Sequence, residues 1–213
     1  VTVLEMLPHL LPNEDEEISQ QLERAFGRQG IEFLTEARVN GAIKSDNCVQ
    51  LQVYHNGSET SLEADCVLVA VGVRPNVQGM GLDKIGVELK GEYIQIDESM
   101  ATNVANVYAI GDVTGILPLA HVAQAQAVLA VERIAGLSCP DLNYQLMPKA
   151  TYCHPQVTSF GLTEKQALEQ GYQVKVGKFP FQANGKAMAI GNTEGMVKIV
   201  AEKEYGEILG AHM

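Results

Sequence analysis

The sequence is poor in positive charge, in long apolar runs and in closely spaced cysteines. Lys and Arg number 15 against 26 for Asp and Glu, which gives a formal net charge of −11 at pH 7. Nucleic-acid binding requires a basic surface stripe that faces the phosphates, so this balance argues against a nucleic-acid partner. The longest uninterrupted apolar run, residues 66–73, is too short to span a bilayer, so we expect no membrane partner.

The cysteines offer neither a redox pair nor a metal site. Cys48, Cys66, Cys139 and Cys153 form no C-x-x-C or C-x-x-x-x-C pair, and no histidine lies at zinc-finger spacing. Cys153 precedes His154, but adjacent residues of a strand point to opposite faces. We therefore expect four unpaired thiols, no metal site and a reducing, cytoplasmic location.

What is present is typical of a globular protein of one or two domains, with 46% hydrophobic and 19% charged residues. The chain opens within an apolar alternation and closes in residues 208–213, which are typical of an unfinished strand. We expect both ends to be cuts through a longer protein.

The N-terminal third predicts a crossover followed by a meander. Residues 1–5 and 31–34 are expected to be strands, joined by a helix that begins near Asn13 and Glu16 in a near capping box and ends at Gly30. A strand, a helix and a second strand in this order indicate a parallel pair. Shorter β segments follow and indicate an antiparallel meander, with turns at Asn47 and at Asn56-Gly57. These segments are residues 37–45, 48–55 and 60–64.

Further along, strands are predicted at residues 65–71, 92–97 and 106–110, and an Ala-rich helix at 119–135. Alanines allow such a helix to pack closely against other elements. A Pro- and Asn-containing linker follows at 140–148. Beyond it an α+β layer is expected. Its elements are strands at 150–160, 172–181, 196–200 and from 208 onward, and a helix that Thr163 caps and Gly171 ends.

Glu5 and Gly72 are the first two candidate site residues. A carboxylate just past a parallel strand can accept both hydroxyls of an adenosine ribose, and no Lys or Arg lies between Glu5 and Arg24, which favours NAD over NADP. Taken alone, Glu5 is more simply a surface residue that ends a strand. Gly72 follows an apolar strand, where it permits a ligand to approach the backbone, but a plain turn explains it equally well.

Asp112 is the strongest candidate. Residues 102–110 predict a strand that delivers this acid past Gly111, and an ionised carboxylate can hold the hydroxyl groups of a polyol. Ala120 and His121 then open the Ala-rich helix, whose first N–H groups can stabilise negative charge on an electron-rich ring. A structural role is the alternative for His121.

Residues 102–112 resemble the second flavin motif of the pyridine nucleotide–disulfide oxidoreductases. Residues 119–123, Leu-Ala-His-Val-Ala, resemble the dihydrolipoyl dehydrogenase subfamily, whereas glutathione reductases tend to have Thr-Pro in place of Ala120-His121. Residues 152–157, with Gly161 and Thr163-Glu164, and residues 179–184 are similar to the start of that family's interface domain. The resemblance covers essentially the whole chain.

The resemblance implies an α/β fold in three parts. Residues 1–96 would be a partial Rossmann-like NAD-binding domain with a β-meander, and residues 97–145 the C-terminal part of an FAD-binding domain. Residues 146–213 would be a truncated α+β interface, or dimerisation, domain.

The resemblance also implies cofactor contacts. Asp112, with Gly111, would bind the ribitol and pyrophosphate region of FAD. Four residues would line the flavin ring, namely Pro118, Leu119, Ala120 and His121, although Pro118 stands where relatives often have Met. NAD would contact Glu5, Val39 and Gly72.

The activity implied is oxidation of dihydrolipoamide by NAD⁺ through a redox disulfide and FAD, in a homodimer that serves a 2-oxoacid dehydrogenase complex. The family's C-x-x-x-x-C pair and its first FAD glycine motif do not occur in this chain, nor does the segment that carries the catalytic histidine. We therefore expect no catalytic residue, no lipoamide turnover and little FAD retention in the isolated chain. The alternatives are another disulfide reductase or an NADH oxidase of the same superfamily, and a non-catalytic nucleotide-binding and dimerisation module.

Overall fold

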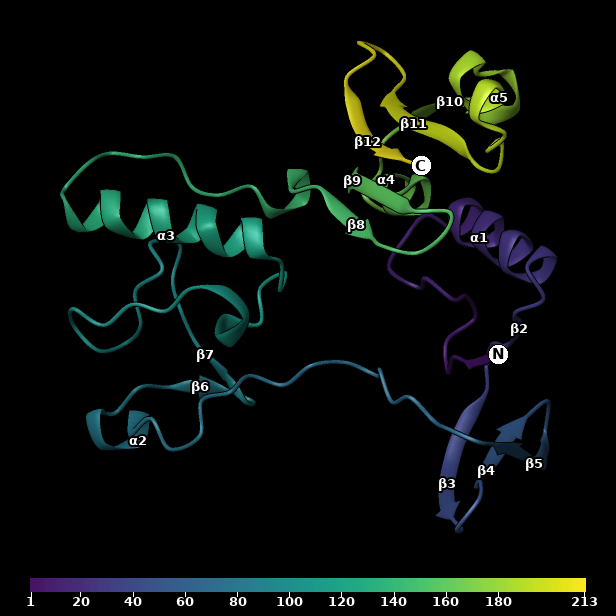
Figure 1. Ribbon diagram of the computed structural model, residues 1–213. Coiled ribbons are helices and arrows are strands. Elements are labelled where there is room, and N and C mark those ends of the chain that lie inside the picture. The colour runs from purple at the N-terminus through teal and green to yellow at the C-terminus, as the bar shows by residue number, and fades with distance from the viewer. The chain divides into compact units, whose positions relative to one another are not determined.

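The computed structural model describes residues 1–213, and the chain divides into two compact units (Figure 1). Unit 1 joins Val1–Val69 to Pro148–Met213, and unit 2 is Ala70–Met147. None of the helices is both long enough and apolar enough to cross a lipid bilayer.

Unit 1 begins with the predicted crossover. Strand β1 (Thr2–Leu4) pairs in parallel with β2 (Glu32–Leu34), and helix α1 (Glu16–Arg28) connects them. The parallel pair is therefore confirmed. The predicted helix start is wrong by two residues, because Asp15 is the N-cap and its carboxylate accepts a hydrogen bond from the Glu17 N–H at 3.1 Å. Asp15 has the extended backbone that an N-cap requires.

The predicted meander is also confirmed. Strands β3 (Arg38–Lys44), β4 (Val49–His55) and β5 (Ser58–Ala64) form an antiparallel sheet in that order. Asn56 and Gly57 both have positive φ, of 51° and 78°, as a tight hairpin turn between β4 and β5 requires. The buried residues of this sheet pack against Leu4 and Leu34 of the parallel pair.

The C-terminal part of unit 1 is a five-stranded antiparallel sheet in the order β10-β11-β12-β9-β8. Its strands are β8 (Lys149–Thr151), β9 (Val157–Gly161), β10 (Val174–Pro180), β11 (Met196–Glu202) and β12 (Ile208–His212). The single strand expected at 150–160 is wrong: it divides into β8 and β9 around a cis His154–Pro155 bond, because proline cannot donate to a ladder.

Helices α1 and α4 (Glu164–Glu169) contact the same side of this sheet. Ile18 and Leu22 of α1 pack against Val157, whereas Ala167 of α4 packs against Val200. A capping box between Thr163 and Gln166 starts α4, as expected. The short elements η3 (Phe181–Ala183) and α5 (Gly185–Ile190) were not predicted.

Unit 2 is built from short elements around two small cores. They are α2 (Leu82–Ile85), β6 (Leu89–Lys90), β7 (Tyr93–Ile94), η1 (Gly111–Thr114), α3 (Ala120–Ile134) and η2 (Tyr144–Leu146). Helix α3 confirms the predicted Ala-rich helix. The strand expected at 92–97 is reduced to β7, and that expected at 106–110 is wrong, since only a single bridge joins Tyr108 to Ala101.

The strand expected at residues 65–71 is also wrong. The ladder of β5 ends at Ala64, and the following residues pair with no strand. Leu68 is 89% exposed and Val71 93% exposed. A continuous apolar run signals burial inside a sheet, but the strand forms only where neighbouring strands accept its backbone hydrogen bonds. The α/β class is confirmed, whereas the boundaries of the three predicted domains stay a prediction.

Candidate functional site

The strongest candidate, Asp112, lies in η1 of unit 2, held by a buried glutamine of α3. The Gly111 N–H donates to Oε1 of Gln126 at 2.6 Å, and Nε2 of Gln126 donates to the Tyr144 hydroxyl at 3.0 Å. Gln126 is fully buried, so both halves of its amide are used inside the protein. The backbone that carries Asp112 is therefore fixed to the helix.

A close approach brings η1 against the first half of α3. Gly111 has φ of +73°, and a Cβ at this position would lie only 3.2 Å from the Cβ of Ala123. Glycine and alanine at this contact allow the backbone of η1 to approach the helix, as the Ala-rich composition of α3 predicted. The structure thus brings Gly111 and Asp112 to the N-terminal part of α3.

The hydrogen bonds within η1 are made by backbone groups and by Thr114, not by the side chain of Asp112. The Thr114 hydroxyl donates to the Gly111 carbonyl at 2.8 Å, and the Gly115 N–H donates to the Asp112 carbonyl at 3.1 Å. The side chain of Asp112 is exposed. A carboxylate on a fixed backbone can accept hydrogen bonds from the hydroxyls of a bound polyol.

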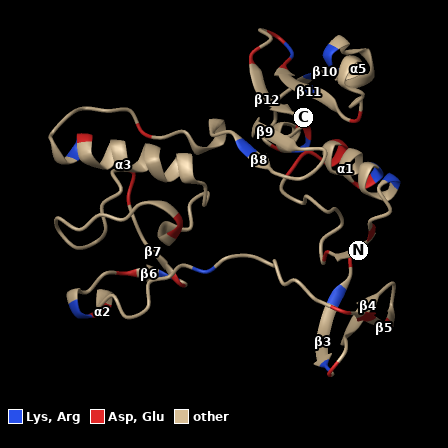
Figure 2. Ribbon diagram, viewed as in Figure 1, with Lys and Arg blue, Asp and Glu red and all other residues tan.

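The start of α3 is open. Leu119 is the N-cap residue and makes no side-chain cap, and the first turn carries no acidic residue, as Figure 2 also shows. The first N–H groups of a helix lack acceptors within the helix and carry positive partial charge. The side chains of Pro118, Ala120 and His121 are exposed around this end, and that of Leu119 is half-buried. The arrangement can stabilise negative charge on a ring placed there.

Glu5 and Val39 both lie in unit 1. Glu5 follows β1 directly: its N–H donates to the Leu34 carbonyl at 2.9 Å, and its Oε1 accepts from the Leu7 N–H at 2.7 Å. The Ala37 N–H donates to the Glu5 carbonyl at 2.9 Å, so the start of β3, which carries the exposed Val39, adjoins Glu5. Gly72 belongs to unit 2, where its φ of +136° suits glycine. The ligand contacts of all these residues stay predictions.

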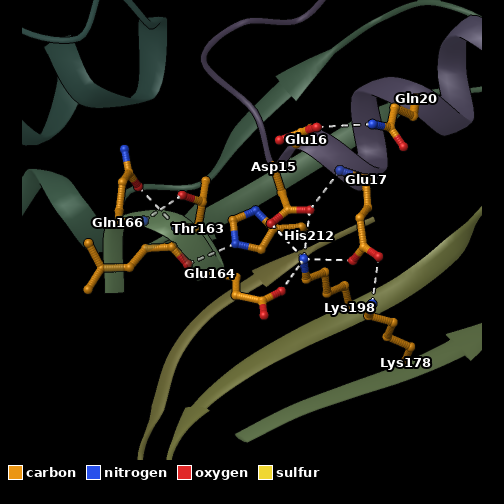
Figure 3. Close-up of polar contacts among 11 residues, drawn as sticks. Asp15, Glu16, Glu17, Gln20, Thr163, Glu164, Gln166, Lys178, Lys198 and His212 are labelled. Atoms are coloured by element: carbon orange, nitrogen blue, oxygen red, sulfur yellow. Dashed lines mark hydrogen bonds and ion pairs between the residues drawn. The ribbon is translucent and has the colours of Figure 1, made fainter. Parts of the chain in front are cut away.

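Sequence reasoning missed a buried cluster of charges in unit 1 (Figure 3). Lys198 of β11 is 2% exposed, and its Nζ lies 2.9 Å from Asp15 Oδ2, 2.7 Å from Glu17 Oε2 and 2.8 Å from Glu164 Oε2. Glu17 also accepts from Nζ of Lys178 at 2.6 Å. A signal was available, because strand alternation places Lys198 on the same face as Val200, which is buried.

The electrostatics of this cluster are internally balanced. Burial alone would lower the pKa of Lys198, but hydrogen bonds to Glu164, Glu17 and Asp15 outweigh it and hold the pKa well above its ordinary value. Hydrogen bonds from Lys178 and Lys198 lower the pKa of Glu17. The charges stabilise one another, and the cluster connects α1, α4 and β11, so its role is structural.

Comparison with known proteins assigns both parts of the chain to one family. Residues 1–127 match the profile described as pyridine nucleotide-disulphide oxidoreductase, and residues 147–213 match its dimerisation domain. Dihydrolipoyl dehydrogenases of Mycobacterium leprae, Corynebacterium glutamicum and Bacillus subtilis are 51%, 46% and 41% identical over the whole chain. The chain spans about half the length of these curated relatives, with 46%, 47% and 45% of each covered.

Solved structures of similar fold cover the whole chain. LpdA from Mycobacterium tuberculosis has a TM-score of 0.89 at 26% identity, with all of this chain and 46% of that chain covered. The HOCl-induced flavoprotein disulfide reductase RclA from Escherichia coli has a TM-score of 0.89 at 25% identity, with all of this chain and 48% of that chain covered. All four cysteines are free thiols in this structure.

Proposed function

Because this chain belongs to the pyridine nucleotide–disulphide oxidoreductase family, we propose that it is part of a dihydrolipoyl dehydrogenase. That enzyme would oxidise dihydrolipoamide with NAD⁺ through FAD and a redox disulfide. The observation that carries the proposal is the exposed Asp112 beside the open start of α3, on a backbone that the bond from the Gly111 N–H to Gln126 fixes to the helix. The names of the curated relatives support the choice of substrate.

The residues of unit 2 fit a flavin. Asp112 and Gly111 would bind its ribitol and pyrophosphate region, and Pro118, Leu119, Ala120 and His121 would lie along the ring. A Cβ at residue 111 would crowd Ala123, so the backbone there is suited to close contacts. FAD supplies the electron-transfer chemistry when bound, and the protein orients it. The open start of α3 would stabilise negative charge on the reduced ring.

The residues of unit 1 fit NAD better than NADP. Glu5 would accept hydrogen bonds from the adenosine ribose, with Val39 of the same unit as a further contact. The NAD contact proposed for Gly72, which belongs to unit 2, rests on the family resemblance alone. A carboxylate at this position disfavours a 2′-phosphate, because two negative charges would meet. Glu5 already orients itself through the Leu7 N–H at 2.7 Å, which leaves its second oxygen available for a ribose hydroxyl.

The disulfide and the catalytic base of the proposed reaction would be supplied by residues outside this chain. None of the four cysteines forms a C-x-x-x-x-C pair. The isolated chain would then have no lipoamide turnover and would hold FAD weakly. Its contribution would be to bind and orient the two nucleotides.

We further propose a cytoplasmic homodimer that serves a 2-oxoacid dehydrogenase complex. The five-stranded sheet lies in the region that matches the dimerisation profile. The face opposite α1 and α4 carries exposed apolar residues, among them Phe179 at 50% and Ile199 at 37% exposed. A second copy would remove this surface from water.

A second candidate is another flavoprotein disulfide reductase. It is favoured by the similarity to RclA, which is structurally as close as LpdA. The Leu119-Ala120-His121 element and the names of the curated relatives favour dihydrolipoyl dehydrogenase. Three assays of the complete protein separate the two candidate functions. They measure the oxidation of dihydrolipoamide by NAD⁺, the reduction of glutathione disulfide and the oxidation of NADH.

The flavin role is tested with Asp112→Ala in the complete protein that carries this chain. We expect the purified variant to lose most of its FAD, measured by visible absorbance, and its dihydrolipoamide:NAD⁺ activity to fall with it. Asp83→Asn, an exposed acid of α2, is the matched control and should retain both. Full FAD content in Asp112→Ala would contradict the flavin site, and a wild-type protein that does not turn over dihydrolipoamide would contradict the proposed reaction.

A further inference from the structure

Helix α1 is tied at its start to β11 of the five-stranded sheet and at its end to the segment just before β11. At its start, Asp15 contacts Nζ of Lys198 at 2.9 Å. At its end, Arg28 contacts Glu194 at 2.7 Å. The helix that connects the parallel strands of the nucleotide-binding half is thus docked on strands of the half that matches the dimerisation profile.

The two ties differ in burial. Asp15 and Lys198 are 3% and 2% exposed, whereas the side chains of Arg28 and Glu194 are 61% and 30% exposed. Solvent-exposed pairs constrain little, because water and salt screen them. A buried pair cannot exchange its partner for water, so separating it leaves an uncompensated charge. The start of α1 is therefore the firmly held end.

Helix α1 also holds the loop that follows Glu5. The Ser19 hydroxyl accepts from the Leu11 N–H at 3.0 Å, and Oε1 of Glu23 accepts from the Leu10 N–H at 3.1 Å. On its near side the loop is held by Glu5, which accepts from the Leu7 N–H. Asp15 joins this loop to the helix, so a displacement of Asp15 passes into residues 6–14.

We infer that Lys198 is a positioning residue for NAD⁺. From β11 it holds Asp15 and with it the start of α1, α1 holds the loop of residues 6–14, and this loop sets the position of Glu5. The inference rests on the proposed function, because it takes Glu5 as the ligand of the adenosine ribose. The ammonium group fixes where α1 begins, and α1 fixes the loop next to that carboxylate. Lys198 itself contacts no substrate.

Two substitutions of equal chemistry test this inference. Asp15→Asn removes the carboxylate that α1 presents to Lys198 but keeps a side chain that caps a helix well. Glu164→Gln removes a carboxylate from the same ammonium, but on α4, and leaves both contacts with α1 in place. Both variants are compared in the complete protein with its flavin bound, together with Arg28→Met at the exposed tie.

We expect Asp15→Asn to raise KM for NAD⁺ severalfold, with kcat and KM for dihydrolipoamide unchanged. Hydrogen exchange at residues 6–14 should become faster in the same variant. Glu164→Gln and Arg28→Met should leave both readouts at their wild-type values. Lys198→Arg, which keeps the charge, should retain more NAD⁺ affinity than Lys198→Gln.

Equal effects of Asp15→Asn and Glu164→Gln on KM for NAD⁺, or none from either, would overturn the inference. If Asp15→Asn does not fold, Glu17→Gln removes the other carboxylate that α1 presents to Lys198 and must move KM for NAD⁺ in the same direction. A wild-type protein without dihydrolipoamide turnover counts against the proposed function alone. Calorimetric NAD⁺ binding and hydrogen exchange then still decide the role of Lys198.

Discussion

The starts of α1 and α3 have the same unpaired backbone N–H groups, but only α1 provides a side chain that caps them. At the start of α1, the Glu17 N–H donates to the carboxylate of Asp15, which also contacts the ammonium group of Lys198. The start of α3 has no side-chain cap, and the exposed Asp112 lies in the adjacent η1. A helix end that is satisfied from within serves the fold, whereas one left open on a fixed backbone is available to a ligand. The three predictions below test that comparison.

The largest effect is expected from removing the cation at the closed end. Lys198→Met leaves the buried carboxylate of Asp15 without its counter-charge, and breaking a buried pair typically costs about 3–5 kcal/mol. Urea denaturation should show this loss in the free energy of unfolding. Lys165→Met, which removes the exposed Lys165–Glu169 pair, is the control and should change stability by less than about 0.5 kcal/mol. A Lys198→Met midpoint equal to that of the wild type would show that the cluster is not structural.

Smaller effects, opposite in sign for stability and for FAD binding, are expected from adding a capping side chain at the start of α3. Leu119→Asp supplies the missing N-cap, which should stabilise the fold by about 1 kcal/mol. The added negative charge should at the same time weaken FAD binding, because it competes for the positive end of α3. Leu119→Ser supplies a neutral cap and separates hydrogen bonding from charge. Thermal unfolding and FAD titration measure the two effects, and tighter FAD binding in Leu119→Asp would contradict the assignment of this end.

The smallest effect is expected in the pH dependence of stability. The pKa of Glu17 is lowered in the folded protein, so its contribution is present above its ordinary pKa of 4.5 and is lost as the pH falls through the lowered value. The pKa of Lys198 is raised, so its contribution is complete below the ordinary value of 10.5 and is lost only in stronger alkali. Between these limits the contributions of Glu17 and Lys198 do not change with pH.

Glu17→Gln should therefore flatten the decline in stability below pH 4.5, with little change in slope near neutrality. The carboxylate is 40% exposed, so the effect is small. Urea midpoints measured from pH 3 to pH 7 check this expectation. An unchanged acid limb would mean that other carboxylates govern acid unfolding.

Local patterns predicted much of unit 1. The crossover of β1, α1 and β2, the meander with its Asn56-Gly57 turn and the capping box at Thr163 all follow from near neighbours in the chain. The same patterns failed at residues 65–71, where the apolar run forms no strand. Strand formation there depends on neighbouring strands, which no local pattern can supply.

The candidate site also has features that the sequence predicts and features that only the structure shows. The glycine before Asp112 and the Ala-rich helix after it were readable from the residue order, and so was the carboxylate after β1. The role of Gln126 was not readable, because its partners Gly111 and Tyr144 are both far from it along the chain. A polar residue inside an apolar helix gives no sign of which backbone group it will meet.

The sequence by itself determined the family, the α/β class and the order of most helices and strands, because short-range preferences and motif residues act over a few positions. Only the tertiary structure decided that Lys198 meets Asp15 across 183 positions and that Gly111 lies against Ala123. Such contacts depend on how distant segments pack, and the low-dielectric interior then makes the pairing of every buried charge obligatory.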